Sequence, residues 1–211
     1  MINFSGICAC VGMNGKKTVF TLTLGFAMLA SAQTQNAPVR RVAVNSGGPT
    51  INLFSNTYTL GSYNQKYHPT WEFTSNEDIN AWTSLVTLMD RTDAKTVPEM
   101  DRLAEGIMTT YKNAGGRVLT AKTLKNEPGV SFNYMLVAFV EPAKHRYELN
   151  YVKIGMGPKN AYVMIIGLRV SDPNDYKAKT KAFLEKRSGE VGSALGNYVV
   201  PDLSTFPRRV F

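Results

Sequence analysis

Three long apolar segments separated by short turns constrain the fold of this chain more than any other feature. They span residues 130–141, 146–154 and 162–170 and are rich in the β-branched and aromatic side chains that favour strands. The turn at 155–158 contains two glycines and a proline, which is typical of a hairpin bend. Because consecutive strands joined by such short connections run antiparallel, the sequence predicts a largely antiparallel sheet.

Four more segments have strand-like patterns, at residues 52–64, 70–74, 81–90 and 116–123. The segment 81–90 is apolar on both faces, so we expect a layer of structure above it and another below it. In 146–154, by contrast, apolar residues alternate with Glu148 and Asn150, which predicts that one face of this strand is exposed to water.

Two helices are expected. The first begins at Thr96, which has a glutamate three residues later, in the spacing of a capping box, and Pro98 in its first turn. It should end at Gly115, because glycine readily adopts the left-handed conformation that ends helices. The second is expected to begin at Asp172, a cap residue followed by proline, and to be kinked or broken at Gly189.

The first 32 residues have the three-part pattern of a secretory signal peptide. Two lysines precede an apolar run at 18–29, and the small residues at 30–32 fit the cleft of a signal peptidase. The alternative is a transmembrane anchor, but a run of about a dozen apolar residues is too short to span a bilayer, which needs about 20. We therefore predict cleavage before Gln33, with Met13 as a possible true start, and a periplasmic or secreted protein.

Cleavage would also remove both cysteines, Cys8 and Cys10, so the remaining chain would suit an oxidising compartment. We expect residues 33–50 to form a flexible arm, 51–198 a single domain and 199–211 an irregular C-terminal tail. Cleavage would remove Lys16 and Lys17 and lower the net charge from +8 to +6, a moderate surplus that would attract anionic surfaces without specifying nucleic acid.

The residue types argue against catalysis, cofactor binding and metal binding. The two histidines, His68 and His145, lie far apart in the sequence, and no cysteine would remain to join them as a metal ligand. At 192–196 a serine lies one place too early for a nucleophile elbow. The glycine-rich stretch 155–159 lacks the spacing of a phosphate-binding loop. We assign no catalytic, cofactor-binding or metal-binding residue.

Two groups of residues are candidates for contact with a partner. Lys177 and Lys181 belong to a basic cluster on the last helix, although the acidic residues among them also fit a solvated helix face. The chain ends in an arginine pair followed by two apolar residues, Arg208, Arg209, Val210 and Phe211. This tail could dock on a partner or extend its sheet, or it could pack against its own domain.

Several segments are similar to the PsbP/Mog1-like proteins. Residues 71–90, with Glu77 and the run Ala-Trp-Thr-Ser-Leu-Val-Thr at 81–87, resemble the early part of these proteins. The segments 132–140, 148–153 and 162–169 resemble their central strands, so the resemblance covers 57 to about 198. It implies an α+β fold, an α/β/α sandwich with a central, mostly antiparallel sheet and two main helices. Such proteins mostly act as binding or assembly factors, and no functional residue is carried over.

Two functional hypotheses follow. The first is an exported, non-enzymatic binding or assembly protein of the bacterial envelope that acts through protein–protein contacts and not through nucleic acid. The second is a small-ligand carrier or enzyme whose site would lie in a cleft beside Trp71, Trp82 or Tyr134. Peripheral contact with an anionic membrane through the last helix is a weaker possibility, and salt should weaken it. No transmembrane segment is expected after cleavage.

Overall fold

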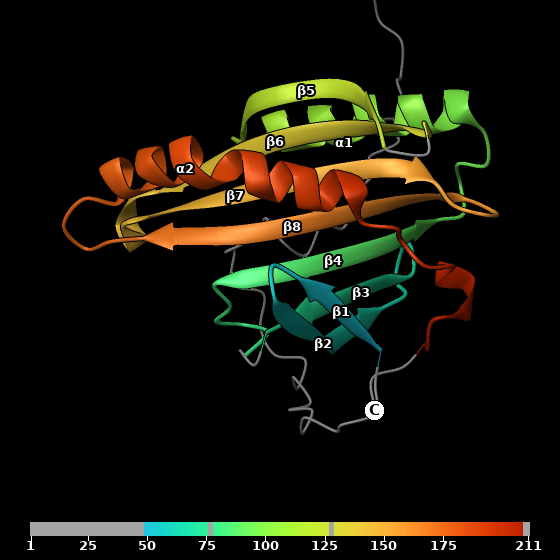
Figure 1. Cartoon of the computed structure of the whole chain (residues 1–211), viewed down its shortest axis with the longest axis horizontal. Coiled ribbons are helices and arrows are strands. Elements are labelled where there is room, and N and C mark those ends of the chain that lie inside the picture. The colour runs from blue at the N-terminus through green and yellow to red at the C-terminus, as the bar shows by residue number, and fades with distance from the viewer. Residues whose placement is uncertain (1–48, 76–77, 127–128, 209–211) are drawn as a thin grey trace, which may run out of the picture.

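The computed structural model describes residues 49–75, 78–126 and 129–208 and has an α+β fold (Figure 1). One antiparallel sheet contains eight strands in the order β1-β2-β3-β4-β8-β7-β6-β5. The strands are β1 (Thr50–Leu53), β2 (Asn56–Asn64), β3 (Thr70–Thr74), β4 (Ser84–Arg91), β5 (Arg117–Lys125), β6 (Ser131–Glu141), β7 (Arg146–Met156) and β8 (Ala161–Ser171). The helices are α1 (Val97–Asn113) and α2 (Tyr176–Asn197), and the short 3-10 turns are η1 (Pro142–Lys144) and η2 (Leu203–Thr205). The predicted antiparallel sheet with two main helices is confirmed.

The two helices cover opposite faces of the sheet, as in a sandwich (Figure 1). On the α1 face, Met100, Ile107 and Tyr111 pack in one apolar cluster with residues of β6, β7 and β8. On the α2 face, Val191 and Leu195 belong to a second cluster that also includes residues of β1 to β4. Strands with apolar residues on both sides therefore have the two covering layers that their sequence requires.

The start of α1 follows the predicted capping box. The Oγ1 atom of Thr96 accepts a hydrogen bond from the backbone N–H of Glu99 at 3.4 Å, and the Glu99 carboxylate accepts one from the N–H of Thr96 at 3.0 Å. The helix ends at Asn113, and Gly115 follows with a φ of 86°. Local sequence signals therefore determine both ends of this helix.

The predicted start of the last helix was wrong. α2 begins at Tyr176, after Asp175 as the cap residue. The carboxylate of Asp172 instead accepts the backbone N–H groups of Asn174 and Asp175, so it forms a turn before the helix. The helix also runs without a break through Gly189, where an added Cβ would meet no atom within 4 Å.

The segment predicted as one strand at 52–64 is a hairpin. Leu53 pairs with Asn56, and the two residues between them, Phe54 and Ser55, have φ angles of 54° and 62°. Two left-handed residues in a two-residue turn are the geometry of a type I′ turn, which normally selects Asn-Gly. Because neither residue is the Asn, Asp or Gly that this turn type selects, the sequence pattern did not reveal the turn.

Candidate functional site

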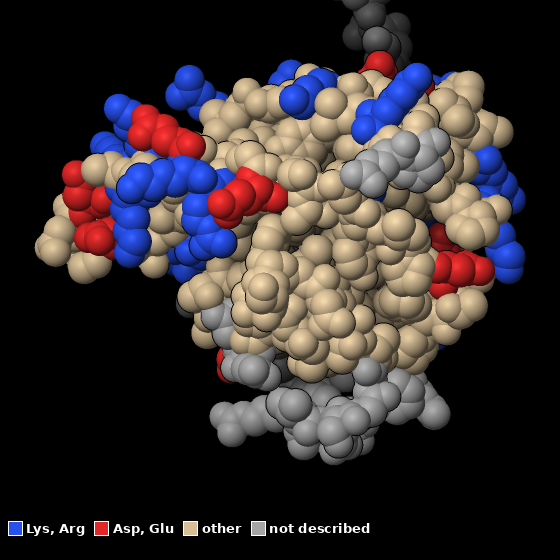
Figure 2. Space-filling view, in the orientation of Figure 1, with Lys and Arg blue, Asp and Glu red and all other residues tan. Residues whose placement is uncertain are grey.

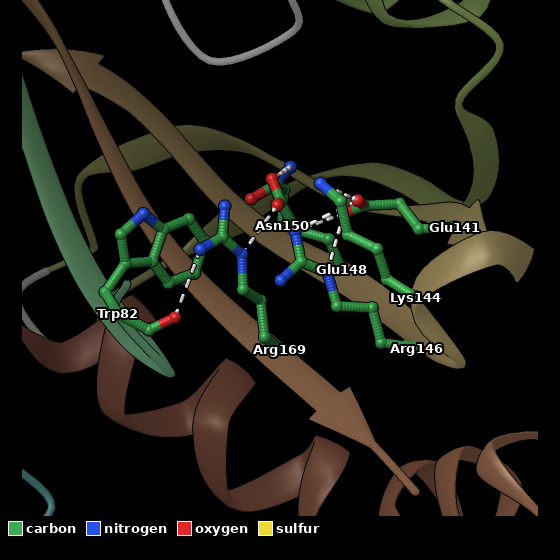
Figure 3. Close-up of polar contacts among 7 residues, drawn as sticks. All are labelled: Trp82, Glu141, Lys144, Arg146, Glu148, Asn150 and Arg169. Carbon is green, nitrogen blue, oxygen red and sulfur yellow. Dashed lines mark hydrogen bonds and ion pairs between the residues drawn. The ribbon is translucent and has the colours of Figure 1, made fainter. Parts of the chain in front are cut away.

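A buried polar cluster lies on the α1 face of β7 and β8 (Figure 3). It consists of Trp82, Glu148, Asn150 and Arg169, and we call it the Trp82 cluster. The register of the sheet places Glu148 opposite Arg169. Glu148 is only 5% exposed and Asn150 only 2% exposed, so the prediction that this face of β7 meets water was wrong.

The physical reason is that Arg169 pairs with Glu148 while the Trp82 ring stacks on the Arg169 guanidinium. The Nε atom of Arg169 donates to Glu148 Oε2 at 3.3 Å, and its Nη1 atom donates to the carbonyl oxygen of Trp82 at 3.2 Å. The guanidinium also lies 3.6 Å from the centre of the Trp82 ring, a cation–π contact. These contacts attach the segment before β4 to the middle of the sheet.

Two buried oxygen atoms near this cluster have no hydrogen-bond partner among the described residues. They are Oδ1 of Asn150 and Oγ1 of Thr87, and both side chains lie on the α1 face. Buried polar atoms in folded proteins are nearly always bonded to protein, water or a ligand. A small polar molecule could therefore donate a hydrogen bond to either of these two atoms.

A second ion-paired group surrounds Glu141 at the turn between β6 and β7 (Figure 3). Arg146 donates two hydrogen bonds of 2.9 Å to the Glu141 carboxylate, and the Lys144 ammonium lies 2.8 Å from it. Burial opposes ionisation of Glu141, but these hydrogen bonds outweigh it and hold its pKa below the usual range. The group therefore stabilises a turn and leaves no free reactive atom.

The two histidines occupy separate structural positions. His68 Nδ1 lies 3.8 Å from Asp93, which also pairs with Arg91 at 2.7 Å. Burial and the Arg91 charge lower the pKa of His68 and outweigh the opposite effect of Asp93. His145 lies in a left-handed position after η1, with its ring edge-on to Tyr176. Within the described ranges, no group of three side chains could hold a metal ion.

The candidate partner-binding residues do not form one surface. Lys177 and Lys181 are exposed on the first turns of α2, and Lys181 lies 3.9 Å from Glu185. Arg208 is exposed and follows η2, beyond the C-terminal end of α2, whereas the two lysines lie near its start. Arg209, Val210 and Phe211 lie outside the described residues, as do the predicted signal peptide and residues 33–48.

The C-terminal segment packs against the domain as far as residue 207. The ring of Phe206 lies 5.5 Å from that of Trp71, edge to face, and 6.4 Å from that of Phe73. The indole Nε1 of Trp71 donates a 2.7 Å hydrogen bond to the carbonyl oxygen of Pro207. Residues at opposite ends of the sequence thus complete one apolar cluster on the α2 face.

An exposed surface without charge lies over the first two strands. From Pro49 to Gln65 the chain contains no charged residue, and we call the surface of this segment the uncharged face. In the view of Figure 2, Lys and Arg gather over α2, whereas the surface over β1–β4 is almost free of blue and red. Aromatic and apolar side chains there are partly exposed, among them Phe54, Leu60 and Tyr63. Our sequence reasoning missed this surface, although the uncharged run itself was the signal.

The three side chains expected beside a ligand cleft are all buried. Trp71 lies beneath Phe206, and Trp82 lies over Gly167. Tyr134 faces Gly192 of α2, with its hydroxyl 3.3 Å from the ideal Cβ position. A cavity of about 20 Å³ lies elsewhere, between the turn after β7 and the segment around η2. It has room for about one water molecule.

Neither helix within the described ranges is long and apolar enough to cross a membrane. Comparison of the sequence with protein-family models gives no match, and comparison with curated proteins gives none either. The α+β fold and the composition of its surfaces therefore carry the functional argument.

Proposed function

We propose that this chain is an exported, non-enzymatic binding or assembly protein of the bacterial envelope, and that it contacts a protein partner through the uncharged face. The proposal rests on one observation: the exposed hairpin and the residues around it, 49–65, contain no charged side chain. Surfaces designed to be soluble aim for about 25–35% charged residues with both signs interspersed. The centres of protein–protein interfaces are depleted of charge and enriched in aromatic residues, as this surface is.

The turn of the hairpin supports the same proposal. Phe54 and Ser55 both have positive φ angles, which cost a residue other than glycine roughly 1–3 kcal/mol. Such strain persists where the conformation is useful, and here it places an aromatic side chain at the tip of the hairpin. An Asn-Gly turn would avoid the strain but would remove this contact residue.

Export rests on the pattern of residues 1–32, and the PsbP/Mog1-like relationship rests on the sequence resemblance over 57 to about 198. Both agree with a binding or assembly factor. Mass spectrometry of the protein secreted or released from the periplasm should find Gln33 as the first residue. A chain that retains residues 18–32 in the membrane fraction would contradict the proposed location.

Site-specific crosslinking tests the binding surface. Thr57 and Asn56 are exposed positions on the two sides of β2, and Asn56 shares the side of Tyr58 and Leu60. A photo-crosslinking amino acid at one of the two should capture one specific protein in the native envelope. Thr109, an exposed threonine on α1, is the matched control and should capture none. Equal capture from β2 and from Thr109, or none from Thr57 and its neighbours Asn52 and Asn56, would contradict the proposal.

A charge placed on the same surface should separate binding from folding. Thr57→Lys or Asn56→Lys should weaken partner capture at least tenfold, because a lysine buried in an interface loses its hydration. Its effect on unfolding should stay within about 0.5 kcal/mol, as for most exposed substitutions. Thr109→Lys should change neither property. Full capture by both Thr57→Lys and Asn56→Lys, which place the charge on the two sides of β2, would exclude this face as the contact surface.

The buried oxygens of Asn150 and Thr87 favour the second candidate function, a small-ligand carrier. The two atoms lie on β7 and β4, on either side of β8, so the candidate is a ligand that donates a hydrogen bond to Oδ1 of Asn150. Native mass spectrometry of the purified protein tests this candidate by detecting a bound small molecule that Asn150→Leu loses. If the two proteins have equal masses after correction for the substitution, no ligand depends on Asn150, and protein binding remains the proposed function.

A further inference from the structure

We propose that the aromatic surface around Trp71 is a recognition site for an extended, proline-containing segment of the protein partner, and that Phe206 and Pro207 of this chain occupy it as an internal ligand. The surface consists of Tyr63, Trp71 and Phe73 on β2 and β3. Trp71 is 0% exposed. Its indole N–H donates to the C-terminal segment.

One residue of the docked segment, Phe206, has the backbone conformation of a polyproline II ligand, and it directly follows the 3-10 turn η2. Phe206 has φ and ψ angles of −70° and 146°, close to the ideal values for this helix. The following proline favours that conformation, because its ring disfavours the α-helical region for the preceding residue. Phe206 is therefore biased towards the extended conformation by its own sequence, which lowers the entropy that this residue loses on docking.

The receiving surface has the two features that such ligands need. The first is an aromatic floor, in which the rings of Tyr63 and Trp71 lie 5.5 Å apart. The Phe206 ring of the docked segment lies 5.5 Å from Trp71 and 6.4 Å from Phe73. The second is a fixed donor for a ligand carbonyl, the indole Nε1 of Trp71, at 2.7 Å from Pro207. Domains that bind proline-rich segments combine an aromatic-lined groove with this preformed conformation.

Leu203 is 6% exposed and anchors the segment in the same apolar cluster, so an external ligand would have to replace Phe206 and Pro207 while Leu203 stays buried. Val199 is 80% exposed, and Pro201, Thr205 and Arg208 are also exposed. The hydrogen bonds around η2 are mainly internal to the segment, such as that from Phe206 N–H to the Leu203 carbonyl. A tethered segment of this kind competes at an effective concentration of roughly millimolar. A partner segment must therefore bind more tightly than the tethered tail at this effective concentration, or bind when the tail is displaced.

This inference deepens the proposed function, because it specifies what part of the protein partner is recognised beside the uncharged face. The test uses the full chain, the peptide acetyl-Ser-Thr-Phe-Pro-Arg-amide and a control peptide with alanine in place of phenylalanine and proline. The two indole N–H signals in an NMR spectrum report binding, and Trp71→Phe identifies the signal of Trp71. Phe206→Ala removes the internal ligand.

We expect Phe206→Ala to bind the peptide at least tenfold more tightly than the unaltered chain, with a shift of the Trp71 signal. The control peptide should not bind, and Trp71→Phe combined with Phe206→Ala should lose binding. If Phe206→Ala does not fold, Pro207→Ala serves instead, with an expected gain of at least threefold. A folded variant that binds both peptides equally, or neither, would overturn the peptide site. If crosslinking from Thr57 is retained in that case, the proposed function stands without the peptide site. If the peptide binds but crosslinking is absent, only the role of the uncharged face as the contact surface is contradicted.

Discussion

The side-chain ammonium of Lys153 lies 2.7 Å from the carbonyl oxygen of Gly196, at the end of α2. It also donates to the carbonyl of Tyr198 at 2.9 Å and lies 4.7 Å from the centre of the Phe132 ring. The last carbonyl groups of a helix have no partner within the helix, and a cation is the favoured partner for them. A residue of β7 therefore holds the C-terminal end of α2 on the sheet.

Burial lowers the pKa of Lys153 to about 8, from 10.5 in an unstructured chain. Between pH 8 and pH 10.5 the unfolded chain binds more protons than the folded one. The free energy of unfolding should therefore rise with pH over this range. We expect a rise of about 2 kcal/mol between pH 7 and pH 10, measured by urea denaturation. Lys153→Met should lack this rise, and Lys159→Met, at an exposed lysine, should retain it.

Above pH 10 the opposite effect begins, because burial raises the pKa of Tyr134 and of Tyr162 to about 12. The unfolded chain then loses protons that the folded chain keeps, and stability falls. A free energy of unfolding that falls steadily from pH 8 to pH 10 in the unaltered chain would contradict the assignment to Lys153.

Gly167 should not tolerate a side chain. An added Cβ would lie 3.1 Å from Cη2 of Trp82 and 3.2 Å from Oδ1 of Asn150. Gly167→Ala should therefore destabilise the fold by about 1–3 kcal/mol and shift tryptophan fluorescence as Trp82 moves. Gly189→Ala is the control, because it lies in exposed helix with open space and should gain about 0.5–1 kcal/mol. Equal stability changes at the two glycines would be inconsistent with the packing of Trp82.

Breaking the ion pair of the Trp82 cluster should be costly. Arg169→Met would leave the Glu148 carboxylate buried without its cation, at a cost of about 3–5 kcal/mol. Adding Glu148→Gln should recover part of this loss, with a coupling energy of about 1–3 kcal/mol in a double-mutant cycle. Arg187→Met, which breaks an exposed pair with Glu190, should cost less than about 1 kcal/mol. If Arg169→Met cost no more than Arg187→Met, the cluster would have no structural role.

The hairpin turn should be stabilised by glycine. Ser55 is exposed and has a φ of 62°, so Ser55→Gly should raise the free energy of unfolding by about 0.5–1 kcal/mol. Ser131→Gly is the matched control at an exposed strand position and should lower it by a similar amount. A loss of stability in Ser55→Gly would mean that the turn is not strained.

Elements with strong local signals were predicted well from the sequence. The capping threonine at 96 and the glycine at 115 bound α1, and apolar runs identified β6, β7 and β8 within a few residues. The hairpin of β1 and β2 and the start of α2 were missed. At Phe54 and Ser55 the pairing of β2 with β3 and β1 imposes a turn that their side chains do not favour.

The sites depend on contacts between distant residues, and these were not predictable from local patterns. Glu148 and Asn150 alternate with apolar residues as in an exposed strand, yet both are buried, and Arg169 pairs with Glu148. The hydrogen bond between Trp71 and Pro207 joins residues 136 positions apart. By itself, the sequence determined where helices and strands form, because capping, turn and alternation signals act within a few residues. Only the tertiary structure decided which polar side chains are buried and what the C-terminal segment covers, because burial depends on chain segments that approach each other after the sheet has formed.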